Sequence, residues 1–274
     1  MVIRHHFVWV HGLMHGAWCW YKTVDLLRRA GRRVATLDLA SCGTLPADPN
    51  TISEFAVYNQ PLSIFSCRCL KPTSGFFHVS NFVIQIVLVG HSMAGFSVSD
   101  AMERFHDILK AVVYISAVLM PSGKSFANSP SFSEMVFKDR PATQGAEATH
   151  PPTSGRVPKS RDCMDCFTTI VHHSIVLHVA GGQDVVLREM LSRPYPAGAM
   201  MMAAITYTNE KHGTVPSVYI KCLQDKVIVP EVQDFLIELN QISQVIEMES
   251  DHSPMLSAPE KLHQILLATA DEYA

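Results

Sequence analysis

Short apolar segments alternate with amphipathic stretches along this chain of 274 residues. Consecutive residues are apolar within most of the short segments, as is typical of strands whose two faces are both buried. The segments predicted as strands are FVWV (7–10), RVATLDL (33–39), VIQIVLV (83–89), AVVYISAV (111–118), PSVYIK (216–221) and QVIEME (244–249). This pattern predicts a mostly parallel sheet.

The stretches between the strands have helical periodicity and recognisable ends. Gly31 is expected to end the first helix, and Thr51 and Glu54 form a capping-box pattern at the start of the second, which Pro61 should end. The predicted helices are 17–31, 51–62, 93–105, 230–240 and 259–273. Strand and helix alternate, so the fold class is α/β with helices flanking the sheet.

The alternation of predicted strands and helices stops between residues 120 and 212. This stretch is rich in Pro, Ser, Gly and Met and contains no clear strand. We interpret the chain 1–274 as one domain, with a helical cap inserted between the fourth and fifth strands at about 120–212.

Composition excludes several classes of protein. Hydrophobic residues make up 47% of the chain and charged residues 17%, which is unlike a disordered protein. The net charge is −3 without a basic stripe, so we expect no nucleic acid and no membrane as partner. No apolar run reaches the roughly 20 residues of a membrane helix, and the start of the sequence lacks the pattern of a signal peptide. We expect a cytoplasmic protein that binds a small molecule, with self-association into a homodimer left open.

Seven scattered cysteines suit a reducing compartment better than a disulfide framework. Cys67 with Cys69, and Cys163 with Cys166, could be interpreted as halves of a metal site near several histidines. Their spacing does not match a compact zinc module, so we expect no metal.

The stretch VGHSMAG (89–95) ends the third strand and begins a helix. Gly-x-Ser at such a junction predicts a nucleophile elbow, in which small flanking residues let strand and helix approach closely. Gly90 and Ala94 are those residues, although the usual pattern has glycine in place of Ala94. Ser92 is then the nucleophile, and the N–H of Met93 faces an oxyanion. The alternative is a serine that only caps the helix.

A serine nucleophile needs a base and an acid that orients the base. Asp225 follows the fifth strand and His252 follows the sixth, so both fall at carboxyl ends of strands and in the order Ser, Asp, His. We therefore predict the triad Ser92, Asp225 and His252. Asp251 is the rival acid, but adjacent side chains usually project apart.

The second oxyanion donor is expected in the loop VHGLMHGAW (10–18) after the first strand. Gly12 allows the backbone to approach the serine, and the amide of Leu13 can face the site. His11 and His15 in this loop could suggest a metal or a second base, but we favour His11 as a hydrogen-bonding support of the loop.

Four segments, HFVWVHGLMHGAWCWYK, LVGHSMAG, QDKVIVPE and SDHSPMLSAPEKLHQILL, closely resemble the plant methylesterase family, to which the plant hydroxynitrile lyases are related. The resemblance implies an α/β-hydrolase fold with a helical cap, no cofactor, and hydrolysis of small methyl esters such as methyl salicylate, methyl jasmonate or methyl indole-3-acetate. It also implies the same triad and the same two oxyanion amides.

The lyase branch of that family has threonine at the position of Gly12 and lysine directly after the catalytic histidine, where this chain has Ser253. The esterase interpretation is therefore favoured over a lyase. Residues 62–85 and 159–182 depart from the family. Either the gene model is altered or the entrance to the site is remodelled. Because the second departure disturbs the cap, a non-catalytic protein that binds a small ligand is another alternative. The candidate substrate-binding residues are Gly12, His15, Met190, Leu191 and Met200.

Overall fold

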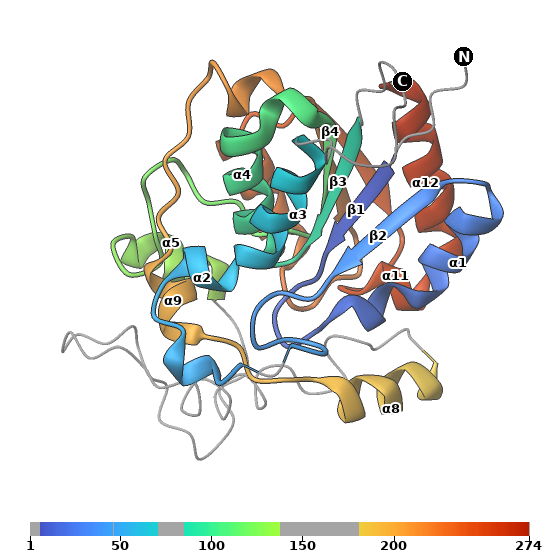
Figure 1. Cartoon of the computed structure of the whole chain (residues 1–274), viewed down its shortest axis with the longest axis horizontal. Helices are drawn as coiled ribbons and strands as arrows, with labels where there is room; N and C mark the ends of the chain where they lie inside the picture. The colour runs from blue at the N-terminus through green and yellow to red at the C-terminus, as the bar shows by residue number, and fades with distance from the viewer. Residues whose placement is uncertain (1–5, 46, 71–84, 138–180, 274) are drawn as a thin grey trace.

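The computed structural model describes residues 6–45, 47–70, 85–137 and 181–273 (Figure 1). Within these ranges one sheet is formed by β1 (His6–Val10), β2 (Arg33–Leu37), β3 (Ile86–His91), β4 (Leu109–Ile115), β5 (Ser217–Cys222) and β6 (Gln244–Met248). The strand order is β2-β1-β3-β4-β5-β6, and every neighbouring pair is parallel. This confirms the parallel sheet predicted from the buried apolar runs.

The sheet separates two apolar cores. Val8 pairs with Leu88 and Trp9 with Val89 across β1 and β3, and successive residues of a strand point to opposite faces. Val8 and Leu88 belong to one core and Trp9 and Val89 to the other. Both faces are therefore covered, which explains why the strands have apolar residues at consecutive positions.

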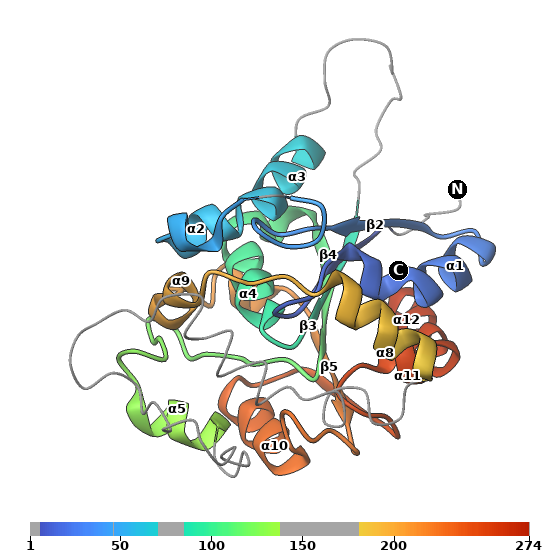
Figure 2. The same ribbon diagram turned by 90° about the horizontal axis from the view of Figure 1, so that it is seen from below.

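Helices form a layer on each side of the sheet (Figures 1 and 2). The core that contains Trp9 is covered by α1 (Tyr21–Arg29), α11 (Pro254–Ser257) and α12 (Pro259–Glu272). The opposite core is covered by α2 (Phe55–Tyr58), α3 (Gln60–Leu70), α4 (Ala94–Phe105) and α10 (Pro230–Leu239). Pro230 and Pro259 lie in the first turn of their helices, as predicted, where their missing N–H has no partner to lose.

The predicted helix 17–31 begins as a 3-10 turn over Ala17–Trp20 and continues as α1. Gly31 adopts φ +74°, directly after the C-cap residue Ala30, which confirms its role as the end of this helix. The fourth strand ends at Ile115 rather than at the predicted residue 118, because Ser116 turns the chain with a φ of 40°.

The single helix predicted over 51–62 is wrong. A 3-10 turn at Pro49–Thr51 is capped by Asp48, and the hydroxyl of Thr51 donates back to the Asp48 carbonyl at 2.8 Å. Glu54 instead precedes α2, and no side chain caps that helix. Pro61 lies in the first turn of α3, where proline is tolerated, so a helix starts there instead of ending.

The chain order of the strands creates a topological switch point between β1 and β3. From β1 the chain passes to β2 on one side, and then returns to β3 on the other side of β1. The loops after β1 and β3 therefore leave in opposite directions, and such a switch point is the usual ligand site of an open α/β sheet.

The stretch 120–212 contains α5 (Pro130–Phe137), α8 (Gly182–Leu191) and α9 (Ala197–Met202). Residues 138–180 lie outside the described part of the chain, as do Cys163, Cys166 and most of both segments that depart from the family. The interpretation of 120–212 as an inserted cap therefore stays a prediction. Of the helices described, none combines the length and the apolar character needed to cross a bilayer.

Candidate active site

Ser92 occupies a strained turn at the carboxyl end of β3. Its φ is 55°, a left-handed conformation that is costly for a residue with a side chain. Its N–H donates to the Ile115 carbonyl at 3.1 Å, and its own carbonyl accepts from Gly95 at 3.1 Å and from Val118 at 3.0 Å. These three bonds hold the turn, which has the geometry of a nucleophile elbow.

The residues around Ser92 are small because the elbow leaves no space. A Cβ added at Gly90 would lie 2.5 Å from a methyl carbon of Val98, and one at Gly95 would overlap the Val118 carbonyl oxygen. Ala94, in contrast, is buried with its methyl group accommodated. The departure from the usual glycine at this position therefore leaves the elbow intact.

Asp225 and His252 form a buried pair. The distance between His252 Nδ1 and Asp225 Oδ2 is 2.7 Å, and the two residues are 3% and 2% exposed. The other oxygen, Asp225 Oδ1, accepts from the backbone N–H groups of Val227 at 2.6 Å and Ile228 at 3.0 Å. Asp225 therefore fixes a proton on His252 Nδ1 and leaves Nε2 as a proton acceptor.

Asp251, the rival acid, is used elsewhere. Its Oδ1 accepts from the N–H of Ser253 at 2.9 Å and from the hydroxyl of Ser257 at 2.6 Å. These bonds hold the start of α11, as expected for an acid that precedes a helix. The structure thus favours Asp225 as the partner of His252.

Ser116 is a site residue that the sequence analysis missed. It follows β4, and its hydroxyl donates to Asp225 Oδ2 and lies 3.5 Å from His252 Nδ1. The available signal was a small polar residue at the carboxyl end of a buried strand, directly beside the ends of β3 and β5. Strand order, which the sequence did not provide, is needed to use that signal.

His91 was also missed, although it directly precedes Ser92. Its Nε2 donates to the backbone carbonyl of His252 at 2.7 Å, and the two rings are 4.6 Å apart. Burial and then the charge of His252 lower the pKa of His91 well below its usual value, so His91 is neutral. This contact places the elbow beside the His252 loop.

No hydrogen bond between Ser92 Oγ and the His252 ring is found in the described part of the chain, as is common before substrate tightens such a site.

The loop after β1 lies against the elbow. A Cβ at Gly12 would be 2.9 Å from Ser92 Cβ, so only glycine permits this approach. Among the hydrogen bonds of the described residues, none uses the N–H of Leu13 or of Met93. Two backbone donors beside a strained serine match the arrangement of an oxyanion hole.

His11 supports this loop, as the sequence indicated. Its Nδ1 donates to the Gly12 carbonyl at 2.7 Å, and its Nε2 accepts from the Leu39 N–H at 3.1 Å. Both ring nitrogens are therefore engaged by backbone, and the contacts of His11 confirm its supporting role.

His15 fixes the opposite side of the loop. Its Nδ1 donates to the Leu13 carbonyl at 2.8 Å and its ring stacks on Trp18. Burial, and then the nearby charge of Arg188, lower the pKa of His15 to about 3. A histidine with this pKa is uncharged at neutral pH and is too weak a base to assist Ser92.

The three cap residues named from the sequence lie in different environments. Met190 on α8 is 75% exposed, Leu191 is half-buried, and Met200 on α9 is buried in the apolar core that also includes Met14 and Met93. The exposure of Met190 argues against a role in lining the site. Met200 has the better position, and a contact with substrate stays a prediction for it and for Leu191.

Comparison with known proteins places this geometry in a wider group. Residues 7–265 match the model of the "Alpha/beta hydrolase family". "Methyl jasmonate esterase 1" of Vitis vinifera is 33% identical over 98% of both chains. A crystal structure of an Arabidopsis methylesterase is 30% identical with a TM-score of 0.73, over 97% of this chain and 99% of that one. Tomato "Methylketone Synthase I" complexed with beta-ketoheptanoate is 27% identical with a TM-score of 0.77, over 100% of both.

Proposed function

The chain belongs to the alpha/beta hydrolase family, and from this premise we propose that it is a carboxylesterase for small methyl esters. One observation supports the proposal most strongly. The buried pair of Asp225 and His252, with 2.7 Å between Asp225 Oδ2 and His252 Nδ1, lies beside the elbow that holds Ser92 at φ 55°. The name of the Vitis vinifera relative favours methyl jasmonate as a substrate, and the family resemblance adds methyl salicylate and methyl indole-3-acetate as candidates.

In the proposed reaction Ser92 Oγ attacks the ester carbonyl while His252 Nε2 takes its proton. Asp225 accepts the Nδ1–H of His252 and thereby stabilises the imidazolium that forms. The N–H groups of Leu13 and Met93 donate to the oxyanion, and removing one such donor typically costs about 10²–10³ in rate.

The tetrahedral intermediate collapses when the bond between the carbonyl carbon and the methoxy oxygen breaks. His252 returns its proton to that oxygen, so methanol leaves and an acyl-Ser92 ester remains. Water then attacks the acyl carbon with the same base and the same oxyanion donors. The products are a carboxylic acid and regenerated Ser92.

Methanol release from the three candidate esters tests this proposal, with Ser92→Ala as the essential variant. We expect Ser92→Ala to lower kcat by roughly 10⁴–10⁶. The matched control is Ser97→Ala, which replaces a buried serine of α4 whose hydroxyl has no hydrogen-bond partner among the described residues. Equal turnover by wild type and Ser92→Ala would refute the proposed nucleophile.

A non-catalytic binding protein is the second candidate function. Its support is the departure of residues 159–182 from the family, because a triad without a shaped pocket would bind an ester poorly. The two candidates differ in the turnover of p-nitrophenyl acetate: an esterase gives a rate that Ser92→Ala abolishes. Background rates for both proteins, together with binding of a hormone acid, would identify a binding protein.

A hydroxynitrile lyase is the weaker alternative because such an enzyme needs a cation to hold the departing cyanide. Ser253, which follows His252, is uncharged and fully buried. We therefore expect no cyanide release from mandelonitrile, and cyanide release at a rate comparable to ester hydrolysis would overturn the choice.

We also propose a cytoplasmic location. Its support is that Cys19, Cys42 and Cys222 are buried free thiols, as suits a reducing compartment. Three relatives are named chloroplastic, so imaging a fluorescent fusion must separate the cytosol from plastids. The assembly state is a separate question, and light scattering decides between a monomer and a homodimer.

A further inference from the structure

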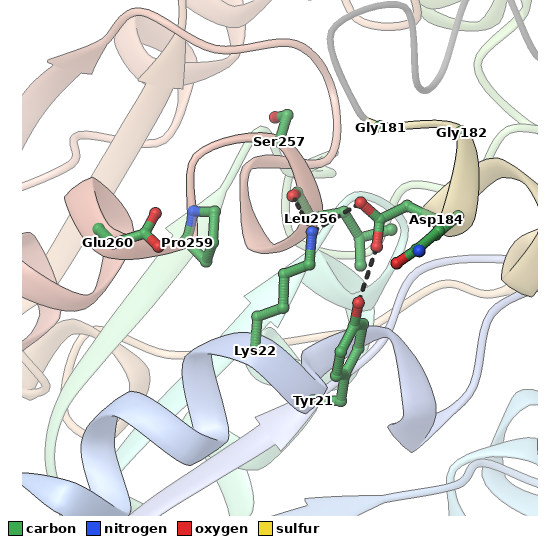
Figure 3. Close-up of a pocket in the computed structure, with 10 residues that line it drawn as sticks. Tyr21, Lys22, Gly181, Gly182, Asp184, Leu256, Ser257, Pro259 and Glu260 are labelled. Carbon is green, nitrogen blue, oxygen red and sulfur yellow. Dashed lines mark hydrogen bonds and ion pairs between the residues drawn. The ribbon is translucent and has the colours of Figure 1, made fainter.

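Lys22 connects three elements that are far apart in the sequence (Figure 3). Its Nζ donates to Asp184 Oδ2 on α8 at 2.6 Å and to the Leu256 carbonyl on α11 at 3.0 Å. The adjacent hydroxyl of Tyr21 donates to Asp184 Oδ1 at 3.0 Å. We call Tyr21, Lys22, Asp184 and the Leu256 carbonyl the Lys22 clamp. These residues are among those that line an open pocket of about 540 Å³ between α1, α8, α11 and α12.

The clamp supplies hydrogen bonds to the carboxylate of Asp184, which is buried away from water. The side chain of Asp184 is only 3% exposed, while that of Lys22 is 30% exposed. A buried carboxylate is costly unless it is paired and hydrogen-bonded, and here each oxygen has its own donor. Asp184 also lies in the first turn of α8, where the helix dipole favours a negative charge. This cluster of polar contacts therefore helps to fix the first turn of α8 on the domain.

The far end of α8 is tied to the candidate oxyanion loop. Just beyond the helix, the N–H of Arg193 donates to the Met14 carbonyl at 3.1 Å. Met14 adopts φ 62° and directly follows Leu13, whose amide is a proposed oxyanion donor. A shift of α8 would thus reach Leu13 through Met14.

The clamp also reaches the loop that carries His252. Leu256 belongs to α11, which begins at Pro254, two residues after His252. The side chain of Lys22 therefore bridges α8, which is joined to the oxyanion loop, and α11, which adjoins the base of the candidate triad.

We propose that Lys22 is a positioning residue, which seats α8 through Asp184 and so fixes the Leu13 amide and the His252 loop for catalysis. The proposal rests on the proposed esterase function. Lys22 does not touch reacting atoms, so its effect must pass through Asp184 and Leu256. Loss of the clamp should then lower kcat more than it raises KM, because the oxyanion bond strengthens only in the transition state.

The activity test compares Lys22→Met, Lys22→Arg, Asp184→Leu and the double variant Lys22→Met/Asp184→Leu. We expect Lys22→Met to lower kcat by about 10–100-fold with KM changed less than about threefold. Lys22→Arg should stay within about fivefold of wild type, because it keeps the positive charge. If the two side chains act through one another, the double variant should lose no more than the worse single variant.

Arg29→Met is the matched control on the same helix. Arg29 forms an exposed pair with Asp25, with side chains 76% and 58% exposed, and such pairs contribute little. Its kcat should equal that of wild type. A Lys22→Met enzyme with unchanged kcat, or additive losses in the double variant, would overturn the proposal. If Lys22→Met does not fold, the near-isosteric Asp184→Asn replaces it.

Amide hydrogen exchange tests the clamp independently of activity. In Lys22→Met, exchange should be faster at Arg193 and through residues 182–191, and unchanged in β3. Unaltered exchange at Arg193 would contradict the proposed path to Met14. If wild type hydrolyses no ester, the proposed function fails, while exchange still decides whether Lys22 seats α8.

Discussion

The carboxyl ends of β3 to β6, which we call the rim, carry Ser92, Ser116, Asp225 and His252. The rim and the segment over it, from α8 to α9, are held in place in very different ways. At the rim, Asp225 alone receives two backbone N–H groups, the Ser116 hydroxyl and the His252 ring. The polar links of α8 and the residues after it to the domain include the Lys22 clamp, the bond between Arg193 and Met14, and the bond from the Ser41 hydroxyl to the Pro194 carbonyl. The outward face of α8 carries Met190, which is 75% exposed.

This difference separates the chemistry from the choice of substrate. The groups that would react lie on strand ends that are fixed by backbone bonds and by burial on both sides. The exposed face of the segment that would contact the acyl group can change without disturbing Ser92 or His252, whereas its clamped face, at Asp184 and Arg193, is coupled to them. The predictions below test that separation.

The largest effect is expected at the rim, from Asp225→Asn. The amide cannot hold His252 in the tautomer that leaves Nε2 free, so kcat should fall by about 10⁴. Steady-state kinetics with the best ester of the panel measures this. The neighbouring Asp251→Asn, which changes the acceptor of the Ser253 N–H and the Ser257 hydroxyl, should stay within about tenfold of wild type. Equal losses in both variants would contradict the assignment of Asp225.

A smaller effect on kcat is expected from a Gly→Ala change beside Ser92, at Gly12, than from Asp225→Asn, and none from the same change in α8, at Gly182. At Gly12 the added Cβ would lie 2.9 Å from both Ser92 Cβ and His91 Nδ1, so the oxyanion loop must shift. We expect kcat to fall by about 10–100-fold, since displacements near 1 Å can cost 10² in rate. In Gly182→Ala, at the start of α8, the added Cβ meets no atom of the described residues within 4 Å, so we expect wild-type kinetics. Comparable kinetics for the two variants would show that the rim is not rigid.

Low pH should lower the free energy of unfolding, because histidines near the rim are buried in the uncharged form. His15 keeps a folded-state pKa of about 3, against about 6.5 in the unfolded chain. Between these values the unfolded chain binds the extra proton, so the free energy of unfolding falls as pH is lowered from about 6.5 towards 3. The loss is up to about 1.4 kcal/mol per pH unit for each such histidine, and His91 should add to it. Urea unfolding at pH 7, 6 and 5 measures the slope, and His15→Asn should reduce it. A slope that is independent of residue 15 would refute this origin.

The smallest effect is expected from Met190→Ala on the exposed face of α8. Its free energy of unfolding should change by less than about 0.5 kcal/mol, and KM should not change. Met200→Ala, which empties a core position on α9, should destabilise by about 2–5 kcal/mol. A raised KM in Met190→Ala would restore the interpretation of Met190 as a pocket residue.

The sequence by itself determined the strands, the elbow and the order of the candidate triad, because these depend on local patterns. Consecutive apolar residues identify a strand buried on both faces, and Gly90 and Ser92 at a strand end identify the turn. Asp225 and His252 were found because the carboxyl ends of parallel strands share one edge. Local rules failed at Pro61, where proline is compatible with either the end or the start of a helix.

The tertiary structure alone decided which distant atoms meet. Ser116 reaches Asp225 across 109 positions of the chain, and Lys22 reaches Asp184 across 162. Such contacts depend on strand order and on the orientation of whole helices, which periodicity does not encode. The same holds for Met190, because an amphipathic helix such as α8 specifies an inward face only once the domain beneath it is in place.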